Sequence, residues 1–373
     1  MNLEEISKSS DPEFVEILEK AIERKELTIE EGERLLRSKG SEIENLIEVA
    51  DKIRREEVGD IVTYVVNRNI NFTNICINSC KFCAFHKPSD SPGSFLLSKK
   101  EVAKKTQEAV KKGATEICFQ GGLNPALTFD DYLEYIRAIR SISDEIHIHS
   151  YSPAEIDFMK RDTDLSLEET IEKLKEAGLD SVPGTAAEIL VDRVRKIICP
   201  NKISVEKWEK IIKTLHKLDV PTTATIMYGH VETPREIASH LAKIREIQKE
   251  TNGFTELVPL PFASQNTELQ KERLVKSLSE RDHFVIHAVA RLMLNPHIKN
   301  IQTSWVKLSP KLAQKTLNAG SNDFSGTLIE ENITKAAGGK YQELKSEEIR
   351  NLIKEAGRIP KQRTTTYELV VDS

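Results

Sequence analysis

The sequence predicts an α/β protein built as a (β/α)8 TIM-type barrel, complete or slightly open. Short apolar runs alternate with charged amphipathic stretches from about residue 62 onward. About seven or eight such units fit within roughly 260 residues, as a barrel of this kind requires. Repeated strand–helix alternation predicts a parallel sheet. No Gly-x-Gly-x-x-Gly turn follows the first strand, which disfavours the alternative of an open doubly wound sheet.

Three parts of the chain are predicted. Residues 1–58 are expected to form a helical N-terminal extension, because Asp11-Pro12 can begin a helix and Thr28-Ile-Glu-Glu31 has the capping-box pattern. Residues 59–320 form the predicted barrel. Residues 321–373 form a C-terminal extension that wraps back onto the barrel.

The elements of the barrel follow from this alternation. The predicted strands are 70–75, 116–120, 146–149, 181–182, 222–227, 256–260, 301–304 and 324–328. The predicted helices between them are 99–112, 129–141, 167–177, 205–218, 234–250, 279–294 and 310–318. Gly113 and Gly178 stand where two of these helices should end. Since barrel enzymes carry their chemistry at the carboxyl ends of the strands, candidate residues are sought there.

Composition and charge exclude several classes of partner. The chain has 373 residues with 54 basic and 59 acidic side chains, a net charge of −5 and no basic block, so no nucleic acid partner is expected. The longest apolar runs, such as 61–66, are too short to cross a membrane. The N-terminal residues have no secretory pattern. We expect a cytoplasmic protein in a reducing compartment, where free thiols persist.

Cys76, Cys80 and Cys83 are the most informative residues. Their spacing is Cys-x3-Cys-x2-Cys, with Phe82 just before the last cysteine. Iron–sulfur clusters are held by thiolates, and a 4Fe–4S cluster has four irons to ligate. Three cysteines leave one iron open to a small molecule, and S-adenosylmethionine (SAM) bound there begins radical chemistry.

A zinc site and a disulfide framework are the alternatives. No second Cys/His pair follows at zinc-finger spacing, although His86 could complete a three-cysteine, one-histidine site. Only 5 cysteines occur in 373 residues, which disfavours disulfides. Cys118 and Cys199 lack cluster spacing, and we interpret Cys118 as a small buried apolar residue.

Gln120-Gly121-Gly122 ends the second strand of the prediction. Two glycines there let the backbone approach a ligand closely and offer free N–H and C=O groups, suited to the amino and carboxylate groups of SAM. A glycine pair is often only a turn. Its position at the end of the strand after the cysteines favours a role in binding.

The third and fourth strands end in further polar residues. His147 and His149 alternate onto one side of their strand, pointing either into the barrel or toward the helices, and contact with substrate or cofactor is about as expected as a structural role. Glu188 could accept hydrogen bonds from a ribose diol, and Arg193 or Arg195 could hold a carboxylate. A capped helix start with an exposed salt bridge is the simpler alternative.

The fifth strand ends in Tyr228, His230 and Glu232, where His230 and Glu232 could exchange protons or hold an amino acid. Asn322 and Asp323 near the last strand could do the same, although Asn-Asp is also ordinary turn chemistry.

With these motifs assembled, the chain resembles the radical SAM superfamily through the three cysteines and Gly121-Gly122. Within it, the chain is most similar to the deazaflavin (FO) synthase subunit 2 family. That likeness rests on segments 67–74, 120–123, 147–153, 183–190, 222–230 and 362–365, and it runs from about residue 60 to the C-terminus. Many superfamily members have Gly-Gly-Glu after the second strand. Here Leu123 stands in place of that glutamate, so the ligand of the SAM amino group is undefined.

The resemblance implies a 4Fe–4S cluster on the three cysteines, with one open iron, and SAM as the second cofactor. It makes Phe82, Gln120, Gly121, Gly122, Glu188 and Arg193 the candidate cofactor-binding residues. His149, Tyr228 and His230 are the candidate catalytic or substrate residues.

The resemblance also implies a reaction. A 5′-deoxyadenosyl radical would take hydrogen from the amino group of L-tyrosine, the Cα–Cβ bond would break, and the 4-hydroxybenzyl group would join C5 of 5-amino-6-(D-ribitylamino)uracil. A reductant such as ferredoxin or flavodoxin, and the second FO synthase enzyme, are the implied partners. Related aminofutalosine and cyclic futalosine synthases of menaquinone synthesis are one alternative. A non-catalytic iron–sulfur or zinc protein is another.

Overall fold

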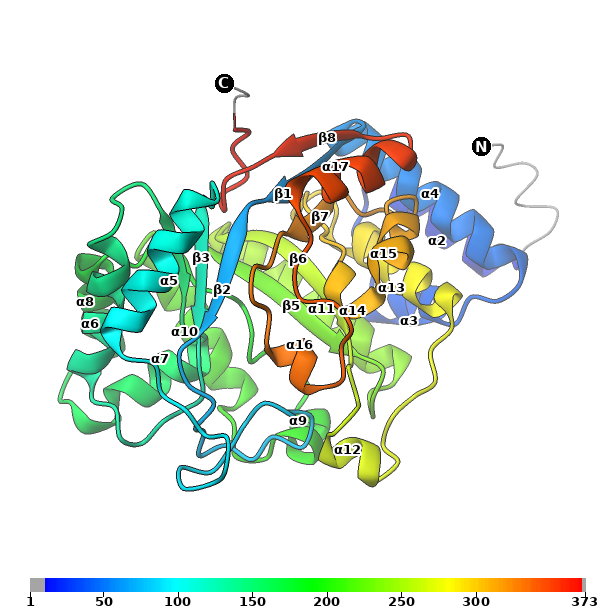
Figure 1. Cartoon of the computed structure of the whole chain (residues 1–373). Helices are drawn as coiled ribbons and strands as arrows, with labels where there is room; N and C mark the ends of the chain where they lie inside the picture. The colour runs from blue at the N-terminus through cyan, green and yellow to red at the C-terminus, as the bar shows by residue number, and fades with distance from the viewer. Residues whose placement is uncertain (1–10, 371–373) are drawn as a thin grey trace.

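The computed structural model describes residues 11–370, which form a ring of parallel strands surrounded by helices (Figure 1). The strands are β1 (Ile61–Val65), β2 (Asn67–Asn71), β3 (Glu116–Gln120), β4 (His147–Ser150), β5 (Thr222–Tyr228), β6 (Phe254–Pro261), β7 (Asp323–Gly326) and β8 (Ile359–Gln362).

The strands form three sheets, in the orders β7-β1-β8, β2-β3-β4 and β5-β6. Isolated parallel bridges join the sheets to one another, among them His149–Ser181, Val182–Thr222 and Leu257–Ile301. The predicted barrel is thus confirmed in its slightly open form. The predicted strands at 181–182 and 301–304 are reduced to such bridges.

The first strand differs from the prediction. The chain forms β1 and β2 before residue 72, and it leaves the sheet where a strand at 70–75 was expected. Phe72 O accepts from Leu97 N at 2.7 Å, and Thr73 pairs with Leu96 in an antiparallel bridge. The apolar run 61–66 is therefore the start of the barrel, and the cysteines stand on a loop beyond its strand.

The helices around the ring match the predicted helices closely. They are α5 (Lys99–Lys111), α6 (Phe129–Arg140), α8 (Leu167–Ala177), α10 (Val205–Lys217), α11 (Pro234–Thr251), α13 (Glu280–Leu294) and α15 (Pro310–Thr316). Most begin with a serine or threonine that caps the first turn, as Ser98 does for α5 and Thr128 for α6. The capping side chains fix where each loop ends, and so fix the loop lengths at the carboxyl end of the barrel.

Shorter helices lie in the loops and were not predicted. They are α7 (Pro153–Met159), the 3-10 turn η1 (Lys160–Asp162), α9 (Asp192–Ile198), α12 (Glu268–Lys271), α14 (Trp305–Leu308), α16 (Ile333–Ala336) and α17 (Ser346–Glu355). Several of them border the site described below.

Three helices precede the barrel: α2 (Pro12–Ile22), α3 (Ile29–Leu36) and α4 (Ser41–Val58). α4 packs on α13 and α3 packs on α11, so this part covers one side of the ring (Figure 1). Residues 1–10 lie outside the described range. The division into three parts stays a proposal, since the segment after residue 320 supplies β7 and β8, which both pair with β1.

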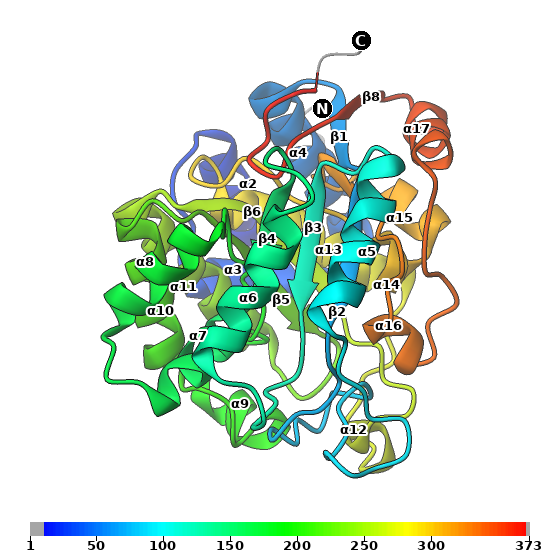
Figure 2. The ribbon, with the colours of Figure 1, turned by 60° about the vertical axis from the view of Figure 1, so that its left-hand side comes forward.

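The two ends of the barrel carry different segments. The loop after β2, α9 and α12 lie at one end, whereas β8 and the C-terminal segment cross the other end (Figures 1 and 2). The strands run toward the first of these ends, so the cysteine loop stands at the carboxyl end of the barrel.

A buried polar network closes the amino end. Arg363 donates to Asp323 at 2.5 Å, and Thr365 donates to Glu116 Oε2 at 2.7 Å. Tyr367 donates to Glu256. Each carboxylate belongs to a barrel strand and each donor to the C-terminal segment. Polar networks at this end of a barrel serve stability rather than chemistry.

Candidate active site

A cavity of about 280 Å³ lies at the carboxyl end of the barrel. It approaches the size of about 300 to 1,000 Å³ that is usual for small-molecule sites. Its lining comes from loops after strands all around the ring. In chain order, the lining residues lie within 71–86, which includes the cysteines, at 120–123, at 152, 154 and 155, at 185, 186, 188 and 202, at 225 and 227, at 260–263, at Lys307, and at 333 and 337.

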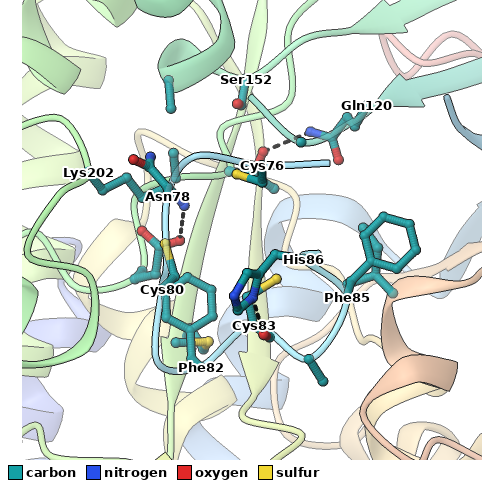
Figure 3. Close-up of a pocket in the computed structure, with 18 of the residues that line it drawn as sticks. Cys76, Asn78, Cys80, Phe82, Cys83, Phe85, His86, Gln120, Ser152 and Lys202 are labelled. Carbon is teal, nitrogen blue, oxygen red and sulfur yellow. Dashed lines mark hydrogen bonds and ion pairs between the residues drawn. The ribbon is translucent and has the colours of Figure 1, made fainter. Parts of the chain in front are cut away.

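Cys76, Cys80 and Cys83 all line this cavity. Figure 3 shows them on one loop, with Phe82 beside Cys80 and His86 beside Cys83. Burial raises the pKa of the Cys76 and Cys80 thiols. Burial also acts to raise the pKa of Cys83, but hydrogen bonding from His86 outweighs it, and the pKa of Cys83 is lowered.

Backbone hydrogen bonds hold the cysteine loop against the glycine pair. Gly122 N donates to Thr73 O and Ile77 N donates to Leu123 O, each at 3.0 Å. A Cβ atom on Gly122 would lie 2.2 Å from Ile75 O, so only glycine fits between the two segments. The glycine pair therefore positions the cysteine loop as well as bordering the cavity.

The N–H groups of Gly121 and Gly122 are not free to bind a ligand, in contrast to the expectation. Gly121 N donates to Glu155 Oε1 at 3.0 Å, and Gly122 N is taken by Thr73. Both N–H groups are thus engaged within the protein. The carbonyl oxygens accept no hydrogen bond from the described residues, which leaves acceptors suited to an ammonium group.

Glu155 is a pocket residue that sequence reasoning missed. It is 2% exposed, stands in the first turn of α7, and accepts from Ser152 N and Oγ, each at 2.7 Å. Burial raises the pKa of Glu155 to about 7. The Ser152-x-x-Glu155 capping-box pattern after a predicted strand was the available signal.

Glu188 lines the cavity within a buried charge cluster. It accepts from Lys202 at 2.7 Å and from Arg195 at 3.2 Å. Burial acts to raise the pKa of Glu188, but the two cations outweigh it and the pKa is lowered. Its φ of 44° is uncommon for a residue other than glycine, and such strain is frequent at functional sites. Lys202 also lies 5.2 Å from the centre of the Phe82 ring, and no local motif marked it.

Four predicted site residues lie away from the cavity. Arg193 is half-exposed and pairs with Glu236 at 2.6 Å, the exposed salt bridge that was the simpler alternative. Tyr228 OH lies 2.8 Å from His283 Nδ1. The structure thus gives both side chains partners outside the cavity.

The two histidines are similarly engaged. His230 lies between Glu232 at 3.0 Å and Met227 O at 3.0 Å. His149 Nδ1 lies 2.7 Å from Ser181 Oγ inside the barrel, and burial lowers its pKa to about 4. None of the four lines the cavity, so we do not place them in contact with ligands.

Asn322 and Asp323 also differ from the expectation. Asn322 accepts from buried Arg291 at 2.9 Å, and Asp323 belongs to the network at the amino end. They lie at the start of β7, whereas a ligand-binding pair would stand at its carboxyl end.

Comparison with known proteins shows to which family the chain belongs. The 5-amino-6-(D-ribitylamino)uracil–L-tyrosine 4-hydroxyphenyl transferase of Archaeoglobus fulgidus is 52% identical over 323 residues, which cover 86% of this chain and 92% of that protein. The protein of the same name from Methanopyrus kandleri is 48% identical over 327 residues, covering 87% and 89%. The chain belongs to this transferase family.

Matches to broader families agree with this membership. Residues 70–244 match the radical SAM superfamily, and residues 251–372 match the CofH/MqnC C-terminal region. The FeFe-hydrogenase maturase HydG superposes with a TM-score of 0.76 over 98% of this chain and 79% of its own, at 17% identity. Methylornithine synthase (PylB) gives a TM-score of 0.71 over 92% and 97%, at 19% identity. These two structures share the fold of the transferase family.

The residues present fit the cofactors of a radical SAM transferase. All five cysteines are free thiols, and three of them line one cavity beside two unengaged carbonyl oxygens. Within residues 11–370, no three Cys, His, Asp or Glu side chains already surround a single point, so the ligand set is a proposal. In the same range, no helix is both long and apolar enough to span a membrane.

Proposed function

We propose that this transferase cleaves the Cα–Cβ bond of L-tyrosine and joins the 4-hydroxybenzyl group to C5 of 5-amino-6-(D-ribitylamino)uracil, a step in deazaflavin (FO) synthesis. The observation that carries the proposal is the meeting of the three cysteines, the glycine pair and Glu155 in one cavity. Relatives at 46 to 52% identity that bear the name of this activity support the choice of substrates over the futalosine alternatives.

Cys76, Cys80 and Cys83 would hold a 4Fe–4S cluster through three of its irons. When bound, the cluster and SAM supply the electron and the 5′-deoxyadenosyl radical that begin the reaction. The Gly121 and Gly122 carbonyls would accept hydrogen bonds from the SAM ammonium. Glu155 would supply the negative charge that Leu123 cannot provide after the glycine pair.

Glu188 would hold the ribose of SAM, since its carboxylate borders the cavity and is kept charged by Lys202 and Arg195. Phe82 would pack against the adenine, and Gln120, which donates to Thr185 at 2.8 Å, would form the wall between the cluster and the barrel interior. The loops around the ring would exclude water from the reacting groups.

The test uses anaerobically reconstituted protein given a chemical reductant, SAM, tyrosine and the aminouracil, with products identified by mass spectrometry. The proposal predicts 5′-deoxyadenosine together with a 4-hydroxybenzyl adduct of the uracil. Deoxyadenosine formed only with futalosine-type substrates would overturn the choice of substrate. No deoxyadenosine from protein with an intact cluster would overturn the radical reaction. The same assay with ferredoxin or flavodoxin, and with the second FO synthase enzyme added, tests the proposed partners.

A further inference from the structure

Lys307 is a cation in the cavity to which the proposed function gives no role. The lining contains two lysines, Lys202 and Lys307. Lys202 is paired with Glu188 at 2.7 Å. Within residues 11–370, Lys307 Nζ has neither a hydrogen bond nor an ion pair, and the two glutamates of the lining, Glu155 and Glu188, are bonded to other groups. A partly buried ammonium without an acceptor is expected to receive one from a ligand.

The position of Lys307 is fixed by its neighbours. It belongs to α14, in which Trp305 is fully buried and its indole N–H donates to Gly326 O at 2.8 Å. Val306 and Leu308 on either side are also buried. The backbone of α14 is thus anchored, and the lysine is presented to the cavity rather than carried on a free loop.

Lys307 also comes from a different part of the ring than the residues proposed to hold SAM. Gly121 follows β3, Ser152 follows β4 and Glu188 follows the bridge at 181–182. Lys307 follows the bridge at 301–302, which lies between β6 and β7 on the opposite part of the ring. The lining of the same cavity includes the apolar side chains Phe262, Ala263, Ile333 and Ala337. A ligand held by Lys307 would thus reach the cavity from this part of the ring, with Cys83 close enough to influence the charge of the lysine.

We propose that Lys307 binds the carboxylate of the tyrosine substrate and so selects an α-amino acid over an amine. This deepens, and rests on, the proposed function. The aminouracil carries no carboxylate, and the SAM carboxylate belongs at the cluster side of the cavity. Of the three molecules, only tyrosine would then bring a carboxylate to this apolar region. The apolar side chains there could pack against the tyrosine ring. Burial lowers the pKa of Lys307, opposed by Glu331 and Cys83, and a bound carboxylate would raise this pKa and so favour the charged form.

The test compares tyrosine with tyramine, which lacks only the carboxylate. Binding of each is measured by equilibrium dialysis on cluster-loaded, oxidised enzyme with SAM, where no turnover occurs. In Lys307→Met, tyrosine should bind about 10- to 100-fold more weakly, as expected for loss of a charge-assisted hydrogen bond. Tyramine binding, SAM binding and iron content should stay unchanged. Lys307→Arg should recover part of the tyrosine affinity.

The matched control is Lys311→Met, an identical substitution at an exposed lysine paired with Glu355 on the surface. This control substitution should change the binding of neither tyrosine nor tyramine. Equal weakening of tyrosine and tyramine, or weakening of SAM alone, would overturn the assignment of Lys307. If the wild-type enzyme binds no tyrosine, the proposed function fails instead, so the two failures are distinguishable.

Discussion

Replacing Gly122 with alanine should separate cluster binding from folding. The added Cβ would lie 2.2 Å from Ile75 O and 2.8 Å from the Cβ of Cys76, whereas real Cβ contacts do not fall below 3.0 Å. The cysteine loop must therefore retreat by at least 0.8 Å from Gly122. Metal–ligand distances tolerate only about 0.2 Å, so this displacement is large for Cys76.

The expected result is a folded protein that holds its cluster poorly. Overpacking costs about 1–3 kcal/mol in the free energy of unfolding. Cluster affinity should fall roughly 10- to 100-fold, the range found when groups that orient metal ligands are altered. After anaerobic reconstitution, the loss of iron and of cluster absorbance is followed under a chelator challenge, and unfolding is followed separately by circular dichroism in urea.

Gly357→Ala is the matched control. Gly357 has φ of 73°, and no neighbouring atom would lie within 4 Å of a Cβ added there. Alanine at this position therefore brings backbone strain of about 1–2 kcal/mol without touching the cysteine loop. Both variants should lose similar stability, but only Gly122→Ala should lose iron. Equal retention of iron by Gly122→Ala and the wild type would refute the role given to the glycine pair.

Three further predictions concern other parts of the molecule. Arg363→Met leaves buried Asp323 without its cation, so it should lower the free energy of unfolding, measured by urea titration, by about 3–5 kcal/mol. The control Arg281→Met removes one partner of an exposed ion pair and should lower the same free energy by about 1 kcal/mol or less. Because the pKa of Glu155 is raised to about 7, its negative charge is lost as pH falls through 7. SAM affinity measured by dialysis should therefore weaken from pH 8 to pH 6, by up to about tenfold per pH unit. The Glu155→Gln variant should bind SAM weakly at both pH 8 and pH 6. Cys80→Ala should abolish the four-iron cluster measured by iron and sulfide analysis, while Cys199→Ala, whose thiol does not line the cavity, should retain it; a four-iron cluster in the first variant would contradict the ligand assignment.

Much of the fold could be predicted from sequence because the barrel elements carry local signals. Serine and threonine caps marked the starts of the outer helices, and β3 and α8 match their predicted ranges. β8 was missed because it contains Pro360 and pairs only with β1 at the edge of a sheet, where proline is tolerated. β1 was missed because its apolar run precedes the polar strand Asn67–Asn71, which resembles a loop by composition.

The site was predictable only where chemistry requires a fixed local spacing. The three cysteines and the glycine pair have such a spacing, and they meet in the cavity. Glu155, Lys202 and Lys307 come from separate loops, so their approach depends on the closed ring and leaves no local pattern. The polar residues Tyr228 and His230 stand at a strand end as expected, but their partners outside the cavity cannot be read from the sequence.

The network at the amino end of the barrel has a consequence for how the chain folds during synthesis. Thr63 and Asp323 are 260 residues apart, Thr365 and Glu116 are 249 apart, and Tyr367 and Glu256 are 111 apart. Contacts of such separation form late and slowly. A nascent chain halted on the ribosome before residue 363 would expose three carboxylates that the finished barrel buries. Proteolytic removal of this short segment would likewise take one partner from each of the three carboxylates in a single cut, leaving them donors from the barrel itself, among them Thr63 for Asp323, Asn67 for Glu116 and Gln302 for Glu256.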